Sequence, residues 1–157
     1  MLRLALAVTL GVALLAAAAP AVDDARATNA DRQVLRQADS VTDAAVRLTD
    51  RSDPVPPHLP GARRTVTVTL PDDTPSSTGL DYLAVGGTPA GVDAPDPRDG
   101  DVIVYRLDGQ RPRVVHVDVD LRATADVDDS PVVLRDDATL VLRLVSHDGR
   151  PIVVVDR

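Results

Sequence analysis

The sequence contains no cysteine, phenylalanine or tryptophan, and these absences limit the kinds of site and of hydrophobic core that the chain can form. Without cysteine it forms no disulfides, no thiolate zinc site and no lipid-modified N-terminal cysteine. Tyr82 and Tyr105 are the only aromatic residues, so valine and leucine must supply nearly all of the buried surface. Because β-branched valine favours strands, this composition predicts a domain built largely of β-structure.

Lysine and glutamate are also absent, so all seventeen basic residues are arginine and all twenty-four acidic residues are aspartate. The net charge is −7, and residues 23–157 alone carry −8. An acidic, lysine-free surface suits a protein in concentrated salt, where a Debye length of roughly 3 Å weakens like-charge repulsion. We interpret the composition as haloarchaeal; the alternative is an acidic secreted protein of a mesophile. The acidic balance argues against binding to nucleic acid or to anionic lipid surfaces.

The longest apolar run covers residues 4–22, with the sequence LALAVTLGVALLAAAAPAV. As a helix it would span roughly 28 Å, which is close to the thickness of the bilayer hydrocarbon. Arg3 precedes the run, and Asp23 and Asp24 follow it. The positive-inside rule therefore predicts a cytoplasmic N-terminus and an extracellular C-terminal domain.

Two interpretations of residues 1–22 remain open, a transmembrane anchor and a cleavable signal segment. The length of the run favours an uncleaved anchor, because it exceeds the usual apolar core of a signal peptide. The small-residue triplet Ala19-Pro20-Ala21 favours a secretory signal, since it matches a cleavage site. In the second case the mature protein is secreted.

An amphipathic helix is predicted over residues 23–52. Its apolar residues recur at spacings of three and four: Ala27, Ala30, Val34, Ala38, Val41, Ala45 and Leu48. This face could be an ordinary core-facing stripe, and the helix could also continue from the membrane segment as one rod bent at Pro20. Residues 53–62 contain four prolines and are predicted to be a stiff linker or the start of the domain.

From Thr65 onward the apolar period becomes two, which is typical of half-buried strands. Residues 63–157 are therefore predicted to form six or seven strands, at 65–70, 80–85, 101–107, 113–121, 131–135, 139–145 and 151–156. Hairpin turns are expected at Asp108–Gln110 and Ser146–Arg150. No helical period follows Arg51, so the helical crossovers that parallel strands need are missing and the pairing should be mostly antiparallel. The predicted inward set is Val66, Val68, Leu70, Val115, Val117, Val119, Leu140, Leu142 and Leu144.

No motif of a known reaction is present: the chain has no P-loop, no GxGxxG and no GxSxG elbow. We therefore predict a protein that is not an enzyme, with no catalytic, cofactor-binding or metal-binding residue. A hydrolase with a Ser-His-Asp set is the less favoured alternative, because nothing in the sequence marks a nucleophile. Two aspartate clusters nevertheless invite a calcium hypothesis, because calcium prefers carboxylate oxygens. They comprise Asp93, Asp96, Asp99 and Asp101, and Asp126, Asp128 and Asp129. Neither cluster has EF-hand spacing, so a solvated acidic surface is the favoured interpretation.

Three histidines, His58, His116 and His147, could form a zinc site only if the fold gathered them. No pair has the spacing of zinc ligands, and His116 lies on the polar side of its predicted strand. We therefore predict no zinc site.

The order of apolar helix, amphipathic helix and β-domain resembles that of type IV pilins and pseudopilins. Pilins carry a basic leader before the apolar helix and a glutamate within it, whereas here the run begins at Leu4 and glutamate is absent. The stretches MLRLALAV, PAVDDAR and GARRTVTVTLP are similar to an uncharacterised haloarchaeal family associated with pilus-like or type II secretion-like gene clusters. The resemblance implies a setting at the cell surface and assigns no functional residue.

These observations together predict an α+β protein with a sandwich or pilin-like antiparallel sheet. The expected function is that of a non-enzymatic, membrane-anchored accessory protein of a pilus-like or secretion-like surface assembly. Its partners would be the membrane, through the N-terminal helix, and other proteins of the assembly. The alternative is a secreted or anchored β-domain that binds a ligand or an ion.

Overall fold

The computed structural model describes residues 2–92, 101–123 and 130–157. It has the predicted α+β fold, with one long helix, α1 (Leu2–Arg51), followed by two four-stranded sheets. The first sheet has the order β1-β7-β8-β5 and the second has the order β4-β3-β2-β6. The strands are β1 (Arg63–Val68), β2 (Leu80–Val85), β3 (Val102–Leu107), β4 (Arg113–His116), β5 (Leu121–Arg122), β6 (Val132–Leu134), β7 (Ala138–His147) and β8 (Arg150–Asp156).

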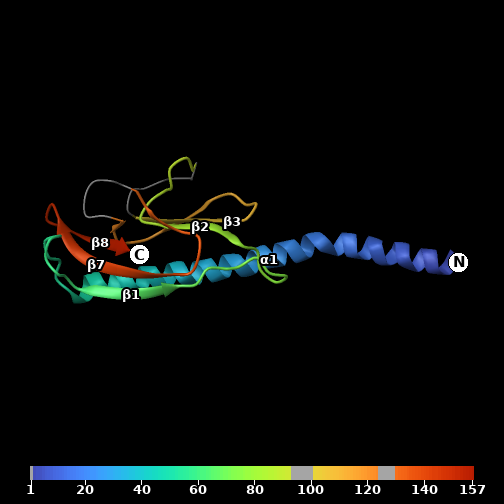
Figure 1. Cartoon of the computed structure of the whole chain (residues 1–157), viewed down its shortest axis with the longest axis horizontal. Coiled ribbons are helices and arrows are strands. Elements are labelled where there is room, and N and C mark those ends of the chain that lie inside the picture. Colours follow the sequence, from blue (N-terminus) through green and yellow to red (C-terminus); the bar gives the residue numbers. More distant parts are fainter. Residues whose placement is uncertain (1, 93–100, 124–129) are drawn as a thin grey trace.

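Helix α1 joins the two predicted helical segments into one element of 50 residues. It continues through Pro20, where the ring removes one backbone hydrogen bond, because the flanking alanines and leucines are strong helix formers. It ends at Arg51, close to the predicted boundary. Asp53 precedes Pro54, and a residue before proline is disfavoured in the helical region. In Figure 1 the C-terminal half of α1 runs along the β-domain and its N-terminal half projects beyond it.

The hydrophobic core lies between α1 and the inner faces of both sheets. Five residues of α1, at spacings of three and four, have no exposed surface: Ala30, Val34, Ala38, Val41 and Ala45. Three of these five are alanine, and such small side chains let the strands pack close to the helix backbone. Seven of the nine residues of the predicted inward set are buried, whereas Val115 and Val119 are partly buried and pack against the same core.

One predicted strand is wrong: residues 113–121 form two strands that belong to different sheets. β4 pairs with β3, whereas β5 pairs with β8. In the crossing between them, Val117 donates a backbone hydrogen bond to Asp101, and Asp120 accepts one from Val153, each at 2.8 Å. The described residues therefore contain eight strands rather than six or seven.

The β5–β8 pair is also parallel, although residues 52–92, 101–123 and 130–157 contain no helix that could form a crossover. The connection from β5 to β8 passes through β6, in the second sheet, and returns through β7. The chain thus crosses between the parallel strands through a strand of the other sheet, where a helix usually makes this connection. All the other strand pairs are antiparallel, as predicted.

Both predicted hairpins are confirmed. β7 and β8 are joined by Asp148 and Gly149, with φ angles of 50° and 77°. Two consecutive residues with positive φ are typical of a type I′ turn, for which Asp-Gly is a preferred sequence. At the β3–β4 turn, Gly109 has a φ of 70° and Gln110 donates a 3.0 Å hydrogen bond to Leu107.

The proline-rich segment 53–62 lies against β7. Val55 bridges Val145, and the amide of Ser146 donates a 2.8 Å hydrogen bond to the Val55 carbonyl. The amide of Leu144 donates in turn to the carbonyl of Ala62, at 3.1 Å. The segment therefore forms the start of the β-domain and fixes it to the end of α1.

Candidate functional site

The N-terminal half of α1 is the most distinctive surface of the protein. Every residue from Leu6 to Ala25 is exposed, and Leu15 has 74% of its surface accessible. The most apolar eighteen-residue window of the helix has a mean hydropathy of 1.9, and none of it is buried. By length and composition this segment can cross a membrane, and both a single-pass anchor and a signal sequence fit the pattern.

Directly after the apolar segment, the helix is bonded to the β-domain through the loop 71–79, which we call the collar loop. The guanidinium of Arg26 donates to a carboxylate oxygen of Asp73 at 2.5 Å and to the carbonyl of Thr74 at 3.0 Å. One turn further on, the side-chain amide of Asn29 donates to the carbonyl of Ser76 at 3.0 Å. These bonds attach the helix to the domain where its burial begins, so they fix the direction in which the apolar half projects.

A second polar contact ties α1 to the second sheet. The hydroxyl of Tyr105, on β3, donates a 2.5 Å hydrogen bond to the Asp31 carboxylate. Arg113, on β4, forms an ion pair with the same oxygen. Burial, together with the hydrogen bond to Asp31, raises the pKa of Tyr105 to about 12. A protonated Tyr105 therefore stabilises the docking of α1 at all neutral pH values.

This contact predicts a loss of stability in strong alkali. The folded-state pKa of Tyr105 lies above the ordinary value of 10, so its contribution is complete below pH 10 and disappears as the pH approaches 12. The free energy of unfolding, measured in urea, should fall less between pH 9 and pH 11.5 in the Tyr105→Phe variant than in the natural chain. At pH 9 the Tyr105→Phe variant should be about 1 kcal/mol less stable than the natural chain, because one hydrogen bond is lost. An equal alkaline loss in both proteins would exclude Tyr105 as the responsible group.

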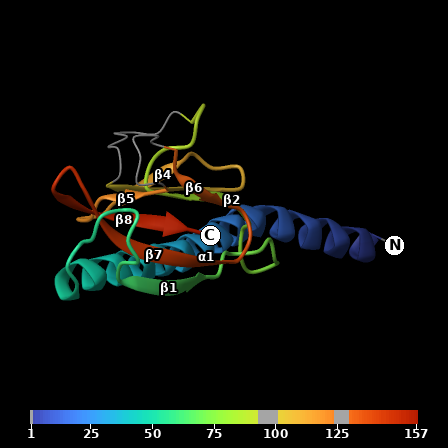
Figure 2. The same cartoon turned by 60° about the vertical axis from the view of Figure 1, so that its left-hand side comes forward.

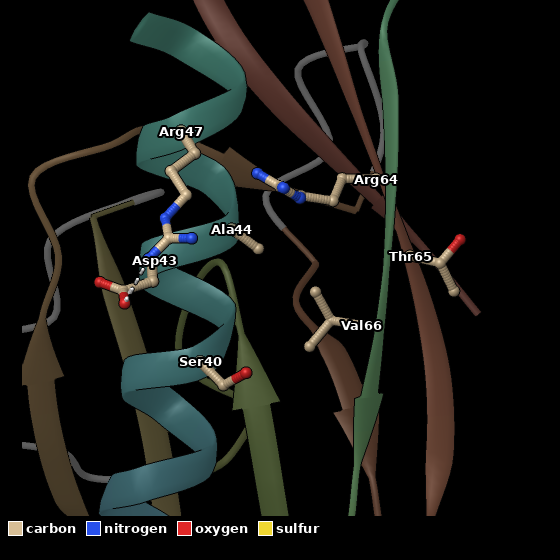
Figure 3. Close-up of a pocket in the computed structure, with 7 residues that line it drawn as sticks. All are labelled: Ser40, Asp43, Ala44, Arg47, Arg64, Thr65 and Val66. Atoms are coloured by element: carbon tan, nitrogen blue, oxygen red, sulfur yellow. Dashed lines mark ion pairs between the residues drawn. The ribbon is translucent and has the colours of Figure 1, made fainter. Parts of the chain in front are cut away.

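A groove of about 280 Å³ separates α1 from the edge strand β1. It is lined by Ser40, Asp43, Ala44, Arg47, Arg64, Thr65 and Val66. Figure 3 shows Arg64 and Val66 pointing toward the helix and Thr65 pointing away from it, while Arg47 and Asp43 form an ion pair at 3.7 Å. The groove holds no cysteine or histidine, so it offers neither a thiolate nucleophile nor an imidazole base.

The structure does not bring the three histidines together as a metal site. His58 and His116 are exposed, and His147 lies at the end of β7 with Nε2 3.6 Å from the Asp148 carboxylate. Within residues 2–92, 101–123 and 130–157, no group of three or more potential ligands is placed to hold a metal ion.

Most of the two aspartate clusters lies outside the described residues, so the calcium hypothesis is not tested there. This applies to Asp93, Asp96, Asp99, Asp126, Asp128 and Asp129. Asp101 is described, and it is exposed directly before β3.

The sequence predicted the apolar segment but neither of the polar contacts that orient it. Arg26 and Asp31 stand on the helix 47 and 74 residues from their partners Asp73 and Tyr105, and no local pattern encodes such pairs. The one available signal was the rarity of tyrosine in a chain that builds its core from aliphatic residues.

No curated protein matches the chain, and no solved structure matches it either. A family model does match, over the full length of residues 1–157, and its description is that of a domain of unknown function, DUF7311. By this match, the chain belongs to the DUF7311 family.

Proposed function

We propose that the protein is a non-enzymatic, membrane-anchored extracytoplasmic component of a cell-surface assembly. The observation that carries the proposal is the division of α1 into two halves. One half is apolar and exposed, and the other is packed into the β-domain. The resemblance to pilins and pseudopilins, in which an apolar helix likewise continues into a helix packed on a sheet, supports the assembly role.

The continuity of α1 supports an uncleaved anchor over a signal peptide. The small-residue triplet Ala19-Pro20-Ala21 lies inside the helix, and Arg26, five residues beyond it, is already bonded to the collar loop. In the anchored protein the acidic domain would lie outside the membrane, in agreement with Arg3 before the apolar run and Asp23 and Asp24 after it.

Fractionation tests the anchor. The full chain should remain with membranes after a wash in concentrated salt and should be released by detergent, because about nineteen apolar residues are buried in lipid. A variant that begins at residue 23 should be recovered in the soluble fraction. If the natural protein is instead soluble and its N-terminal sequence begins at Val22, the segment is a cleaved signal and the anchor is wrong.

The absence of cysteine allows a direct test of orientation. A membrane-impermeant maleimide added to intact cells should label Asp118→Cys, whose position is exposed on the β-domain. It should leave Leu2→Cys unlabelled until the cells are lysed. Labelling of Leu2→Cys alone in intact cells would reverse the proposed orientation.

The assembly role requires a protein neighbour beside the apolar half of α1. A photoreactive maleimide can be attached singly at Leu10→Cys, Leu15→Cys and Ala16→Cys, which are exposed and point to different sides of the helix. Illumination of membranes should give a product larger than the monomer from at least one of these positions but not from all of them. Monomer alone at every position would leave an anchored protein without an assembly role.

A further inference from the structure

A second cavity lies on the outer face of the second sheet, on the side opposite to α1. Its volume is about 660 Å³, within the usual range for small-molecule sites. It is lined by Asp81, Tyr82, Pro89, Ala90, Gly91, Val92, Arg106, Val133, Arg135, Asp136 and Arg157. Tyr82 and Arg106 come from the neighbouring strands β2 and β3, so the rigid sheet forms the floor of the cavity.

Tyr82 carries an unused hydrogen-bond donor. The residue is 4% exposed, and its buried hydroxyl has no hydrogen-bond partner in the described part of the chain. Burial raises the pKa of Tyr82, so the phenol stays protonated at neutral pH. A buried donor without an acceptor destabilises a fold, and phenylalanine would fill the same space without that cost. The hydroxyl thus has no evident role in the folded protein alone.

Of the arginines around the cavity, one is paired with a carboxylate of the described residues and two are not. Arg106 stacks over the Tyr82 ring at 5.2 Å and donates a 2.6 Å hydrogen bond to Asp81, so its charge is neutralised. Arg135 and Arg157 form no ion pair with any residue of the described ranges. Two of the three arginine side chains that line the cavity therefore have no carboxylate partner in the described part of the chain, on a protein whose net charge is −7.

We propose that this cavity binds a small amphipathic carboxylate. The carboxylate would pair with the unpaired guanidinium groups of Arg135 and Arg157, since arginine binds planar carboxylates in bidentate geometry. The apolar body of the ligand would lie against Val92 and Val133. The Tyr82 hydroxyl, which is covered in the free protein, would donate to an oxygen of the ligand once binding displaces the side chains that cover it. The apolar part of the lining favours this class over inorganic anions, which have no apolar surface to bury. The cavity faces away from α1, so the proposal does not depend on the proposed function.

Benzoate is a suitable probe, because it combines a carboxylate with a compact apolar ring. Saturation-transfer NMR with the full chain in phosphatidylcholine nanodiscs, at constant potassium chloride, should show saturable binding of benzoate above the level of empty nanodiscs. Benzamide, which has the same shape without the charge, and inorganic phosphate should bind at least tenfold more weakly. Equal binding of benzamide or phosphate would overturn the proposed ligand class, and no saturable binding of benzoate would overturn the site.

Variants separate binding from folding. Arg135→Gln should weaken benzoate binding at least tenfold, whereas Arg64→Gln, which removes the same charge from the groove beside α1, should leave it unchanged. Tyr82→Phe should raise the unfolding midpoint of the free protein and weaken benzoate binding severalfold. A Tyr82→Phe protein that binds benzoate as tightly as the natural chain, or an Arg135→Gln protein that does so, would show that the cavity does not recognise the ligand as proposed.

Discussion

Val41→Asp should separate α1 from the β-domain and unfold most of the protein. Val41 has no exposed surface and belongs to the core shared by the helix and both sheets. A carboxylate at this position would be buried without a partner, at a cost of at least about 3 kcal/mol. That cost is a large fraction of the total stability of a domain of this size, about 5–15 kcal/mol. Circular dichroism should show a much lower unfolding midpoint, and limited proteolysis should cut within residues 30–48.

Ser40→Asp is the matched control for this prediction. It introduces the same carboxylate one residue earlier, at a position that is exposed. Its effect on the free energy of unfolding should stay within about 0.5 kcal/mol, as for most surface substitutions. Equal stability of Val41→Asp and Ser40→Asp would mean that α1 is not docked along the face formed by Val34, Val41 and Leu48.

Periodicity predicted most of the fold because it directly records which side chains are buried. Val34, Ala38, Val41 and Ala45 lie at helical spacing, and the same residues form the helix side of the core. In the strands, alternation identified the inner faces in the same way, as with the three buried leucines of β7: Leu140, Leu142 and Leu144. Local patterns suffice where one element buries one continuous face.

The pattern failed where one run of alternating valines serves two sheets. Val115, Val117, Val119 and Leu121 alternate without interruption, yet the strand ends at His116 and a new strand begins in the other sheet. Both sheets share a single core, so a residue that faces this core is apolar whichever sheet it belongs to. The parallel β5–β8 pair was missed for a related reason, because pairing partners are set by tertiary contacts and not by local period.

The two candidate sites likewise differ in whether local sequence or tertiary contacts create them. The apolar half of α1 was predicted because a membrane span is a local property of nineteen consecutive residues. The cavity beside Tyr82 was not predicted, since it combines residues from β2, β3, β6 and the C-terminus. Its most informative feature, a buried hydroxyl without a partner, exists only once the chain has folded.

The unfolding midpoint should rise steeply with salt concentration. Several arginines are already engaged in ion pairs, including Arg26 with Asp73, Arg106 with Asp81 and Arg122 with Asp120. The excess of aspartates therefore repels itself across the surface, most strongly when the Debye length is long. Between 0.1 M and 3 M potassium chloride we expect the midpoint to increase by roughly 10 °C, which corresponds to about 2–3 kcal/mol for a domain of this size.

A charge-reduced variant distinguishes screening of this repulsion from a general effect of salt on hydrophobic burial. Asp39, Asp50 and Asp118 are exposed, and their combined replacement by asparagine reduces the net charge from −7 to −4. This variant should be more stable than the natural chain at 0.1 M salt and nearly equal to it at 3 M, because screening removes the difference. We propose a high-salt habitat on the same physical ground. A natural chain whose midpoint is flat with salt, or a variant whose advantage persists at 3 M, would contradict both the repulsion and the habitat.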